Sequence, residues 1–155
     1  MLVNRLVKTS VATAAPEESL QSAAGRMIEE NLGVLPVCDP SEGRRVVGVL
    51  TDRDICRHAC ASGKSLSELR VGDAMTRSVR QCSENDSITD AQLLMAEAGV
   101  HRLPVVDSDG MLQGILSLSD IAAEAARQSH LEKQAVTAAE VASTLAAIGA
   151  SQQAS

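Results

Sequence analysis

The stretch that decides the fold is Gly48-Val-Leu-Thr-Asp-Arg-Asp-Ile55, because it returns 66 residues later as Gly114-Ile-Leu-Ser-Leu-Ser-Asp-Ile121. Each copy begins as a short apolar strand, ends that strand at a hydroxyl residue, Thr51 or Ser117, and continues as a helix. A threonine or serine at this position can accept a hydrogen bond from a backbone N–H of the first helical turn. The sequence therefore predicts the same strand–helix junction in two places.

The residues before the two junctions also repeat, with a spacing of 68. Residues 7–37 match residues 75–105 without a gap, and nine of the 31 positions are identical, including two Leu-Pro-Val runs at 35–37 and 103–105. The spacing falls to 66 across two stretches that hold Asp, Ser and Gly and are typical of hairpin turns. One structural unit is therefore written twice in this chain.

Each copy predicts the order β-α-β-β-α, and the predicted fold class is α/β (α+β). Apolar spacing along 20–28 and 88–98 is that of an amphipathic helix, which Gly99 is expected to end in the second copy. The remaining expected elements are strands at 34–38, 46–50, 103–107 and 112–116 and helices at 52–61 and 118–129.

We expect three parts along the chain: repeat 1 at 1–64, repeat 2 at 65–129, and a C-terminal helix with a flexible tail at 130–155. The last part is rich in alanine, the best helix former. Its helix is expected to end at about Ile148, because Gly149 and the polar residues after it would stop it. Its apolar stripe is expected to pack within the molecule, with a dimer contact as the minority interpretation.

Composition excludes several functions. The chain has no Phe, Tyr or Trp, so its core must be aliphatic and no aromatic ring can stack on a bound base. Acidic residues outnumber Lys and Arg by 20 to 14, for a net charge of −6, which argues against a nucleic-acid partner. The sequence shows neither a membrane span nor a signal peptide, so we expect a cytoplasmic protein with reduced cysteines.

No motif of an enzyme or of a metal site stands out. Recognisable nucleophile elbows and phosphate-binding glycine loops are missing from the sequence, so no catalytic residue is predicted. Cys56 and Cys60 share one helix face while His58 points away, so the three cannot converge on a metal ion. We expect these cysteines to be buried as small apolar side chains, and no metal site is predicted.

Taken together, the repeated motifs resemble the cystathionine-β-synthase (CBS) domain. The motifs are Leu35-Pro-Val, Asp73-Ala-Met-Thr, His101-Arg-Leu-Pro-Val-Val-Asp and the two junction stretches. The tandem resembles a CBS pair, or Bateman module, of the small stand-alone bacterial type. This resemblance implies a pseudo-two-fold sandwich with two clefts between the repeats, often assembled as a homodimer. It also implies a regulatory module that needs no cofactor, senses AMP, ADP, ATP or another adenosyl compound, and signals through dimerisation or an effector protein.

The resemblance also implies which residues bind the ligand. Asp54 and Asp120 would hold the ribose, with the hydroxyls of Thr51 and Ser117 nearby, and His101 with Arg102 would contact phosphate. The extended segments that begin at Val11 and Val79 would line the base pocket, with Thr13 and Gln81 at their polar positions. From the residues themselves, Arg53 at the start of its helix could also reach a phosphate.

Simpler interpretations remain open for each of these residues. Thr51 and Ser117 can be plain helix caps with the aspartates as favourable first-turn charges. His101 and Arg102 can be an exposed pair at a turn, and the Val11 and Val79 segments can be ordinary strand packing. Because the two copies carry their cations at different positions, we expect two inequivalent clefts. The alternative function is a dimeric interaction scaffold that binds no ligand.

Overall fold

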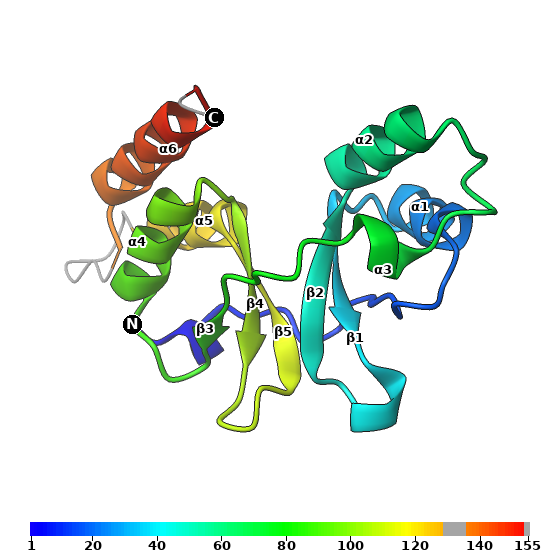
Figure 1. Ribbon diagram of the computed structural model, residues 1–155. Coiled ribbons are helices and arrows are strands. Elements are labelled where there is room, and N and C mark those ends of the chain that lie inside the picture. The colour runs from blue at the N-terminus through cyan, green and yellow to red at the C-terminus, as the bar shows by residue number, and fades with distance from the viewer. Residues whose placement is uncertain (129–135, 154–155) are drawn as a thin grey trace. The chain divides into compact units, whose positions relative to one another are not determined.

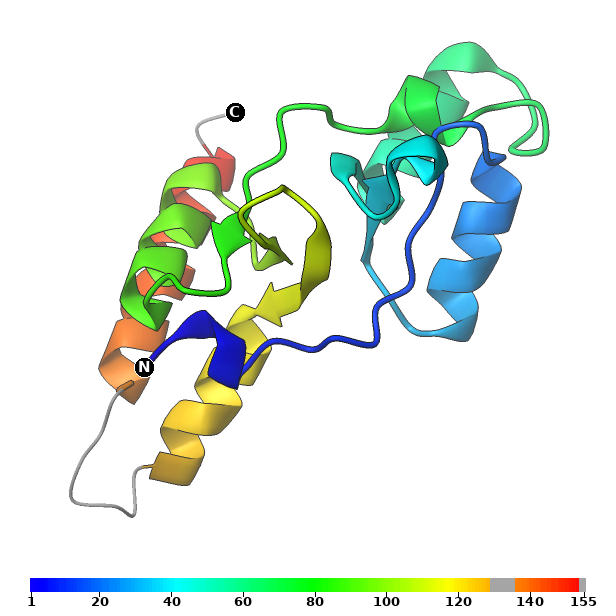
Figure 2. The ribbon, with the colours of Figure 1, turned by 90° about the horizontal axis from the view of Figure 1, so that it is seen from below.

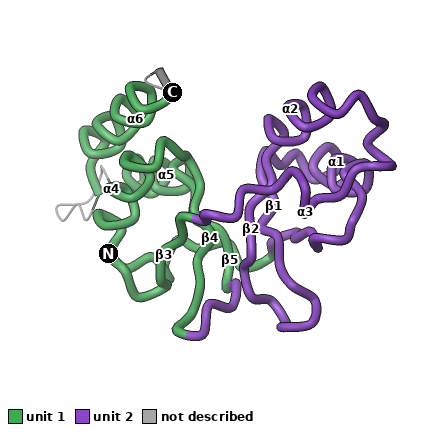
Figure 3. Tube along the Cα trace, in the orientation of Figure 1, with its two compact units in different colours: residues 1–10, 80–108, 113–155 green, residues 11–79, 109–112 purple. Residues whose placement is uncertain are grey.

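The computed structural model describes residues 1–128 and 136–153 (Figures 1 and 2). The chain forms two compact units, coloured in Figure 3. Unit 1 consists of residues 1–10, 80–108 and 113–155, and unit 2 consists of residues 11–79 and 109–112.

Unit 2 is built around an antiparallel pair of strands. Strand β1 pairs with β2 in a register that sets Leu35 opposite Leu50 and Val34 opposite Thr51. Ala14 adds a parallel bridge to Val37 of β1. The elements of this unit are α1 (Leu20–Glu29), β1 (Val34–Cys38), the short 3-10 turn η2 (Pro40–Glu42), β2 (Val46–Thr51), α2 (Asp52–Ser62) and α3 (Val71–Ala74).

Unit 1 repeats this plan. Its sheet has the order β3-β4-β5, and Cys82 of β3 bridges to Val105 of β4 in parallel, as Ala14 does to Val37 in the first copy. Its elements are η1 (Val3–Arg5), β3 (Cys82–Ser83), α4 (Ile88–Ala98), β4 (Arg102–Val106), β5 (Leu112–Ser117), α5 (Leu118–Gln128) and α6 (Ala138–Gln153). The predicted mixed fold of two β-α-β-β-α repeats with an added C-terminal helix is confirmed.

Local signals position the helices as the sequence indicates. Thr51 caps α2, and Gly63 ends it in the left-handed conformation. Ser87 caps α4, and Gly99, with a φ of 65°, ends it. The strand and helix bounds differ from the expected ones by one or two residues at most, apart from the C-terminal helix. Ser129, the last residue expected in α5, lies outside the described residues.

Each unit combines the strands and helices of one copy with the first residues of the other copy. We call residues 1–10 and 69–79 the lead segments. Lys8 exchanges two backbone hydrogen bonds of 3.1 Å with Ile115 of β5. Thr76 does the same with Val49 of β2, at 2.9 and 3.0 Å. Since Lys8 and Thr76 are equivalent positions of the repeat, each sheet is extended in the same register by the lead segment of the other copy.

The lead segments also complete both cores. Val3 and Val71 are equivalent positions, and both are fully buried. Their N–H groups donate to the equivalent carbonyls of Asp86 and Glu18, each at 2.9 Å. Because aromatic residues are missing, both cores consist of aliphatic side chains and sulfur-containing ones such as Met95. The lead segments are therefore structural parts of the units they join and not simple connectors.

Helix α6 differs from the expectation at its end. It begins at Ala138 and continues through Gly149 to Gln153, so the prediction that it stops at Ile148 is wrong. The cause is contact with α4, which Figures 1 and 2 both show alongside α6. Ser151 Oγ donates to the carbonyl of Ala96 at 3.2 Å, beyond the glycine. These contacts offset the weak helix propensity of Gly149, which costs about 1 kcal/mol.

The expected packing of the C-terminal helix within the molecule is observed. Val141, Thr144 and Ile148 of α6 are buried, and Gln92 of α4 donates to Thr144 Oγ1 at 3.3 Å. The expected helix region at 131–135 lies outside the described residues. Among the described helices, none is both long enough and apolar enough to cross a membrane.

The glycines at the equivalent positions 48 and 114 give a direct test of the exchanged lead segments. A Cβ on Gly114 would lie 2.3 Å from the carbonyl oxygen of Lys8, whereas a Cβ on Gly48 would meet mainly the flexible side chain of Met75. We expect Gly114→Ala to lower the free energy of unfolding by about 1–3 kcal/mol, in the range of overpacked sites. Gly48→Ala should cost less. Urea denaturation measures both.

Gly25 supplies the matched control, because it lies inside α1 and a Cβ there would meet no atom within 4 Å. Gly25→Ala should stabilise the protein by up to about 1 kcal/mol through helix propensity alone. If Gly114→Ala were as stable as the wild type, the close approach of the Lys8 backbone to β5 would be refuted.

Candidate functional site

The junction in unit 2 holds a carboxylate with one unused oxygen at the start of a helix. Thr51 Oγ1 accepts from the N–H of Asp54 at 3.1 Å. Asp54 Oδ2 in return accepts from the Thr51 N–H at 3.0 Å and from its hydroxyl at 2.7 Å. In the part of the chain that the structure describes, no hydrogen bond reaches Oδ1 of Asp54. This oxygen remains available to a donor from outside.

The junction in unit 1 has the same hydroxyl–carboxylate pair, but a lysine contacts its carboxylate. Ser117 Oγ accepts from the N–H of Asp120 at 3.1 Å, and the Ser117 hydroxyl donates to Asp120 Oδ2. The second oxygen, Oδ1, forms a salt bridge of 2.7 Å with Nζ of Lys8. Both oxygens of Asp120 are therefore engaged, in contrast to those of Asp54.

These contacts set the charge of Asp120. Partial burial works to raise the pKa of this carboxyl, but hydrogen bonds from Lys8 and Ser117 and the positive charge of Lys8 outweigh it. The pKa is therefore lowered from its ordinary value of 3.8. Asp120 is an anion that can only accept hydrogen bonds at neutral pH.

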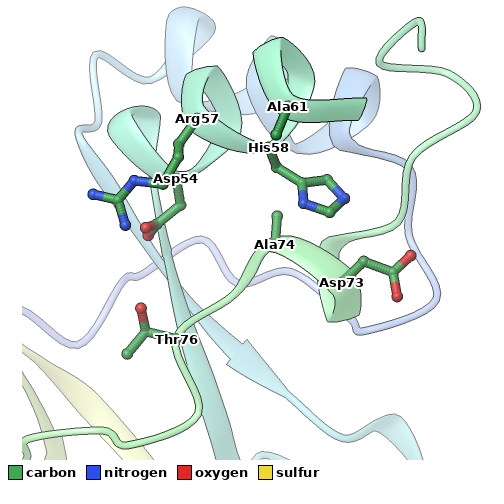
Figure 4. Close-up of a pocket in the computed structure, with 7 residues that line it drawn as sticks. All are labelled: Asp54, Arg57, His58, Ala61, Asp73, Ala74 and Thr76. Carbon is green, nitrogen blue, oxygen red and sulfur yellow. The ribbon is translucent and has the colours of Figure 1, made fainter. Parts of the chain in front are cut away.

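A pocket of about 300 Å³ lies beside the junction in unit 2 (Figure 4). One wall is a face of α2 and the other is α3 with the residues that follow it. Figure 4 shows the carboxylate of Asp54, the ring of His58 and the hydroxyl of Thr76 around this space. The lining residues are Asp54, Arg57, His58, Ala61, Asp73, Ala74 and Thr76. The pocket thus offers carboxylate acceptors together with the cationic donor Arg57, as a ligand with both hydroxyls and an anionic group requires.

Most of this lining was missed from the sequence, although a signal existed. Asp54, Arg57, His58 and Ala61 follow the helical spacing i, i+3, i+4, i+7, so one predicted site residue on α2 implied the others. Arg57, one turn after Arg53, is the arginine that lines the pocket. Arg53 is exposed and is not part of the lining.

The structure distributes the predicted residues over both units. Unit 2 contains six of them: Val11, Thr13, Thr51, Arg53, Asp54 and Val79. Unit 1 contains the other five: Gln81, His101, Arg102, Ser117 and Asp120.

Within unit 1, the backbone places His101 and Arg102 beside the junction. The His101 carbonyl accepts from the N–H of Leu118, the first residue of α5, at 2.9 Å. The side chains of His101 and Arg102 are exposed.

The segment around Thr13 is held by its backbone and by an arginine. Ala14, the next residue, donates to the Pro36 carbonyl at 3.0 Å, and the Thr13 carbonyl accepts from Arg26 of α1. Glu18 forms a salt bridge of 2.6 Å with the same arginine. Val11 and Thr13 are half-buried, as is Val79, whereas Gln81 is exposed. The segment around Thr13 is thus anchored through its main-chain groups, whereas Gln81 has its side chain at the surface.

The prediction for two cysteines is wrong. Cys56 and Cys60 are exposed, because the face of α2 that points inward is the one with Ile55. Cys38 and Cys82 are the buried pair, and burial raises the pKa of the Cys82 thiol to about 11. Among the described residues, His, Cys, Asp and Glu form no group of three that could hold a metal ion.

Comparison with known proteins agrees with this architecture. The family model of the CBS domain matches the chain twice, at residues 3–60 and 71–127. The chain belongs to the CBS domain family. The CBS domain-containing protein YhcV of Bacillus subtilis is 35% identical over 120 residues, which are 77% of this chain and 82% of that protein. The predicted recognition of a tandem CBS pair is confirmed.

Solved CBS structures share the fold and differ in what they hold. CBSX2 in complex with AMP superposes with a TM-score of 0.73 at 28% identity, covering 83% of this chain and 98% of that chain. The CBS pair of MJ0100, in complex with 5'-methylthioadenosine and S-adenosyl-L-methionine, gives 0.68 at 28% identity and covers 79% and 94%. Hypoxic Response Protein I with two coordinated zinc ions gives 0.72 at 30% identity and covers 79% and 98%.

The ion pair at Asp120 predicts a change in titration. In Lys8→Met, the pKa of Asp120 should rise toward 3.8, because the neighbouring positive charge and its hydrogen bond are lost. Carboxyl carbon shifts followed by NMR against pH measure this pKa. Because folding lowers it, the charged carboxylate stabilises the fold above pH 3.8, and this contribution is lost as pH falls through the lowered pKa.

Lys64→Met is the control, since it removes the same charge from an exposed loop position after α2. It should leave the pKa of Asp120 unchanged. An equal pKa in wild type and Lys8→Met would show that the salt bridge does not form in solution.

Proposed function

We propose that the protein is a regulatory module that binds an adenosyl ligand at each of its two strand–helix junctions, with no catalytic role. The observation that carries the proposal is the same hydroxyl–carboxylate pair, Thr51 with Asp54 and Ser117 with Asp120, at the start of α2 and of α5. The presence of AMP, or of S-adenosyl-L-methionine and 5'-methylthioadenosine, in related CBS structures supports the adenosyl class.

The chemistry of the junction suits a ribose. A vicinal diol has two O–H donors, and a charged carboxylate has the acceptor oxygens to receive both. The first backbone N–H groups of the following helix have no partner within the helix, so they favour an anion such as a phosphate nearby. Because the chain has no aromatic side chains, the base must be held by aliphatic side chains and backbone groups, as in the segments near Val11 and Val79.

Several finer predictions of the resemblance stay predictions. These are the clefts between the repeats, the identity of the nucleotide, the homodimer, the effector protein and the cytoplasmic location. We propose that ligand binding changes how the chain associates with a second copy or with an effector protein. A ligand shifts such an equilibrium only by binding one state better than the other. The ligand-free scaffold is the alternative that the following experiment separates.

Thermal melting with AMP, ADP, ATP, NAD, S-adenosyl-L-methionine and 5'-methylthioadenosine tests the proposal. A ligand at 100 times its Kd should stabilise the fold by about 2.7 kcal/mol, which raises Tm by about 5–10 °C in a chain of this size. Asp54→Asn and Asp120→Asn should each reduce the shift, and the double variant should abolish it. Asparagine preserves the shape of the side chain but not the charged acceptor pair.

Asp90→Asn is the matched control. Asp90 holds the same place in α4, with Ser87 as its capping partner at 3.1 Å, but no role is proposed for it in binding. Its ligand-induced shift should equal that of the wild type. If no compound raised Tm in the wild type, the scaffold function would replace the one proposed here.

A further inference from the structure

We propose that Lys8 makes the junction at Asp120 selective for phosphorylated nucleosides over neutral ones. The inference rests on the proposed function, because it concerns the ligand of the same carboxylate. It assigns a role in specificity to a residue of the N-terminal lead segment, which lies far from Asp120 in the sequence.

The backbone fixes Lys8 beside the junction. Its two hydrogen bonds with Ile115 place it at the edge of β5, two residues before Ser117. From there its ammonium reaches Asp120 Oδ1 at 2.7 Å, while Ser117 holds Oδ2. The side chain of Lys8 is 70% exposed and that of Asp120 is 19% exposed, so the pair lies at an opening to solvent.

The equivalent position in the other unit has no such cation. Thr76 occupies it, paired with Val49 by the same two backbone bonds. Its hydroxyl lines the pocket beside Asp54, whose Oδ1 accepts no hydrogen bond from the described residues. A diol can therefore approach Asp54 Oδ1 without competition, whereas at Asp120 it competes with Lys8 for Oδ1.

Displacement has different consequences for neutral and for anionic ligands. A neutral nucleoside that takes Asp120 leaves the ammonium of Lys8 without a counter-ion. A nucleotide supplies a phosphate in its place, so the positive charge is paired again. Partly exposed ion pairs of this kind change affinity by a factor of up to about five each.

The surroundings of Asp120 favour the same ligand class. His101 is held beside the first residue of α5 by its carbonyl, and Arg102 follows it, so an exposed histidine and an exposed arginine come from the backbone next to this junction. The pocket near Asp54 contains a second carboxylate, Asp73, in addition to Arg57 and His58. The junction in unit 1 is thus the more cationic of the two.

Calorimetric titration with AMP and with adenosine tests the role of Lys8. The titrations use the Asp54→Asn variant as the background, so that only binding at the Asp120 junction is measured. Lys8→Thr, which installs the residue found at position 76, should strengthen adenosine binding by up to about fivefold and weaken AMP binding by a similar factor. The preference for AMP over adenosine should therefore fall by up to about 25-fold.

Lys64→Thr in the same background is the control for net charge and should keep the wild-type preference. If Lys8→Thr binds AMP but keeps that preference, the role of Lys8 is refuted while the proposed function stands. If neither AMP nor adenosine binds to any of these variants or to the wild type, the selectivity of Lys8 is refuted, and the melting screen with the other adenosyl compounds decides separately whether the proposed function stands.

Discussion

The close approach of a lead segment to a glycine is the contact on which the rest of the structure depends. The carbonyl of Lys8 lies too close to Gly114 to leave room for a Cβ, and Met75 with Thr76 crowds the equivalent position 48. This approach lets each lead segment pair with a strand of the other copy and bury Val3 or Val71 in its core. Neither repeat supplies a complete unit by itself, so each unit needs residues from both copies.

The same contact decides which side chain stands beside each junction. Lys8 and Thr76 take equivalent places on equivalent strands, one next to Asp120 and the other next to Asp54. The scaffold is thus repeated, with a hydroxyl, a carboxylate and a helix start in each unit, while the lead segment brings a cation to one and a neutral hydroxyl to the other. The proposed difference in binding preference would thus come from a single position of the repeat, occupied by Lys8 in one copy and Thr76 in the other.

The sequence was sufficient to predict the fold and the hydroxyl–carboxylate pair of each junction. The register between the two copies predicted the strands, and Thr51 and Ser117 predicted the helix starts, because these signals are local. The exchange of lead segments could not be predicted, since a spacing of 68 is equally compatible with pairing within a copy and between copies. The contact between Lys8 and Asp120 was missed for the same reason.

Other differences have local causes. The orientation of α2 had to be known before Arg57 and His58 could be placed in the pocket and Cys56 at the surface, although the spacing from Asp54 contained that information. The extension of α6 past Gly149 depends on hydrogen bonds to α4, and helix propensity alone gives no indication of such contacts. Where contacts between distant segments decide the outcome, a pattern along one segment is insufficient.

Two adenosyl sites per chain, one at each junction, are the central claim of this account. Native mass spectrometry of the protein, saturated with the adenosyl compound that raises Tm most, counts bound ligands directly. The proposed function predicts two ligand molecules per wild-type chain, one in either Asp54→Asn or Asp120→Asn, and none in the double variant. Equal numbers of bound ligands in all four proteins, or none in the wild type, would contradict it.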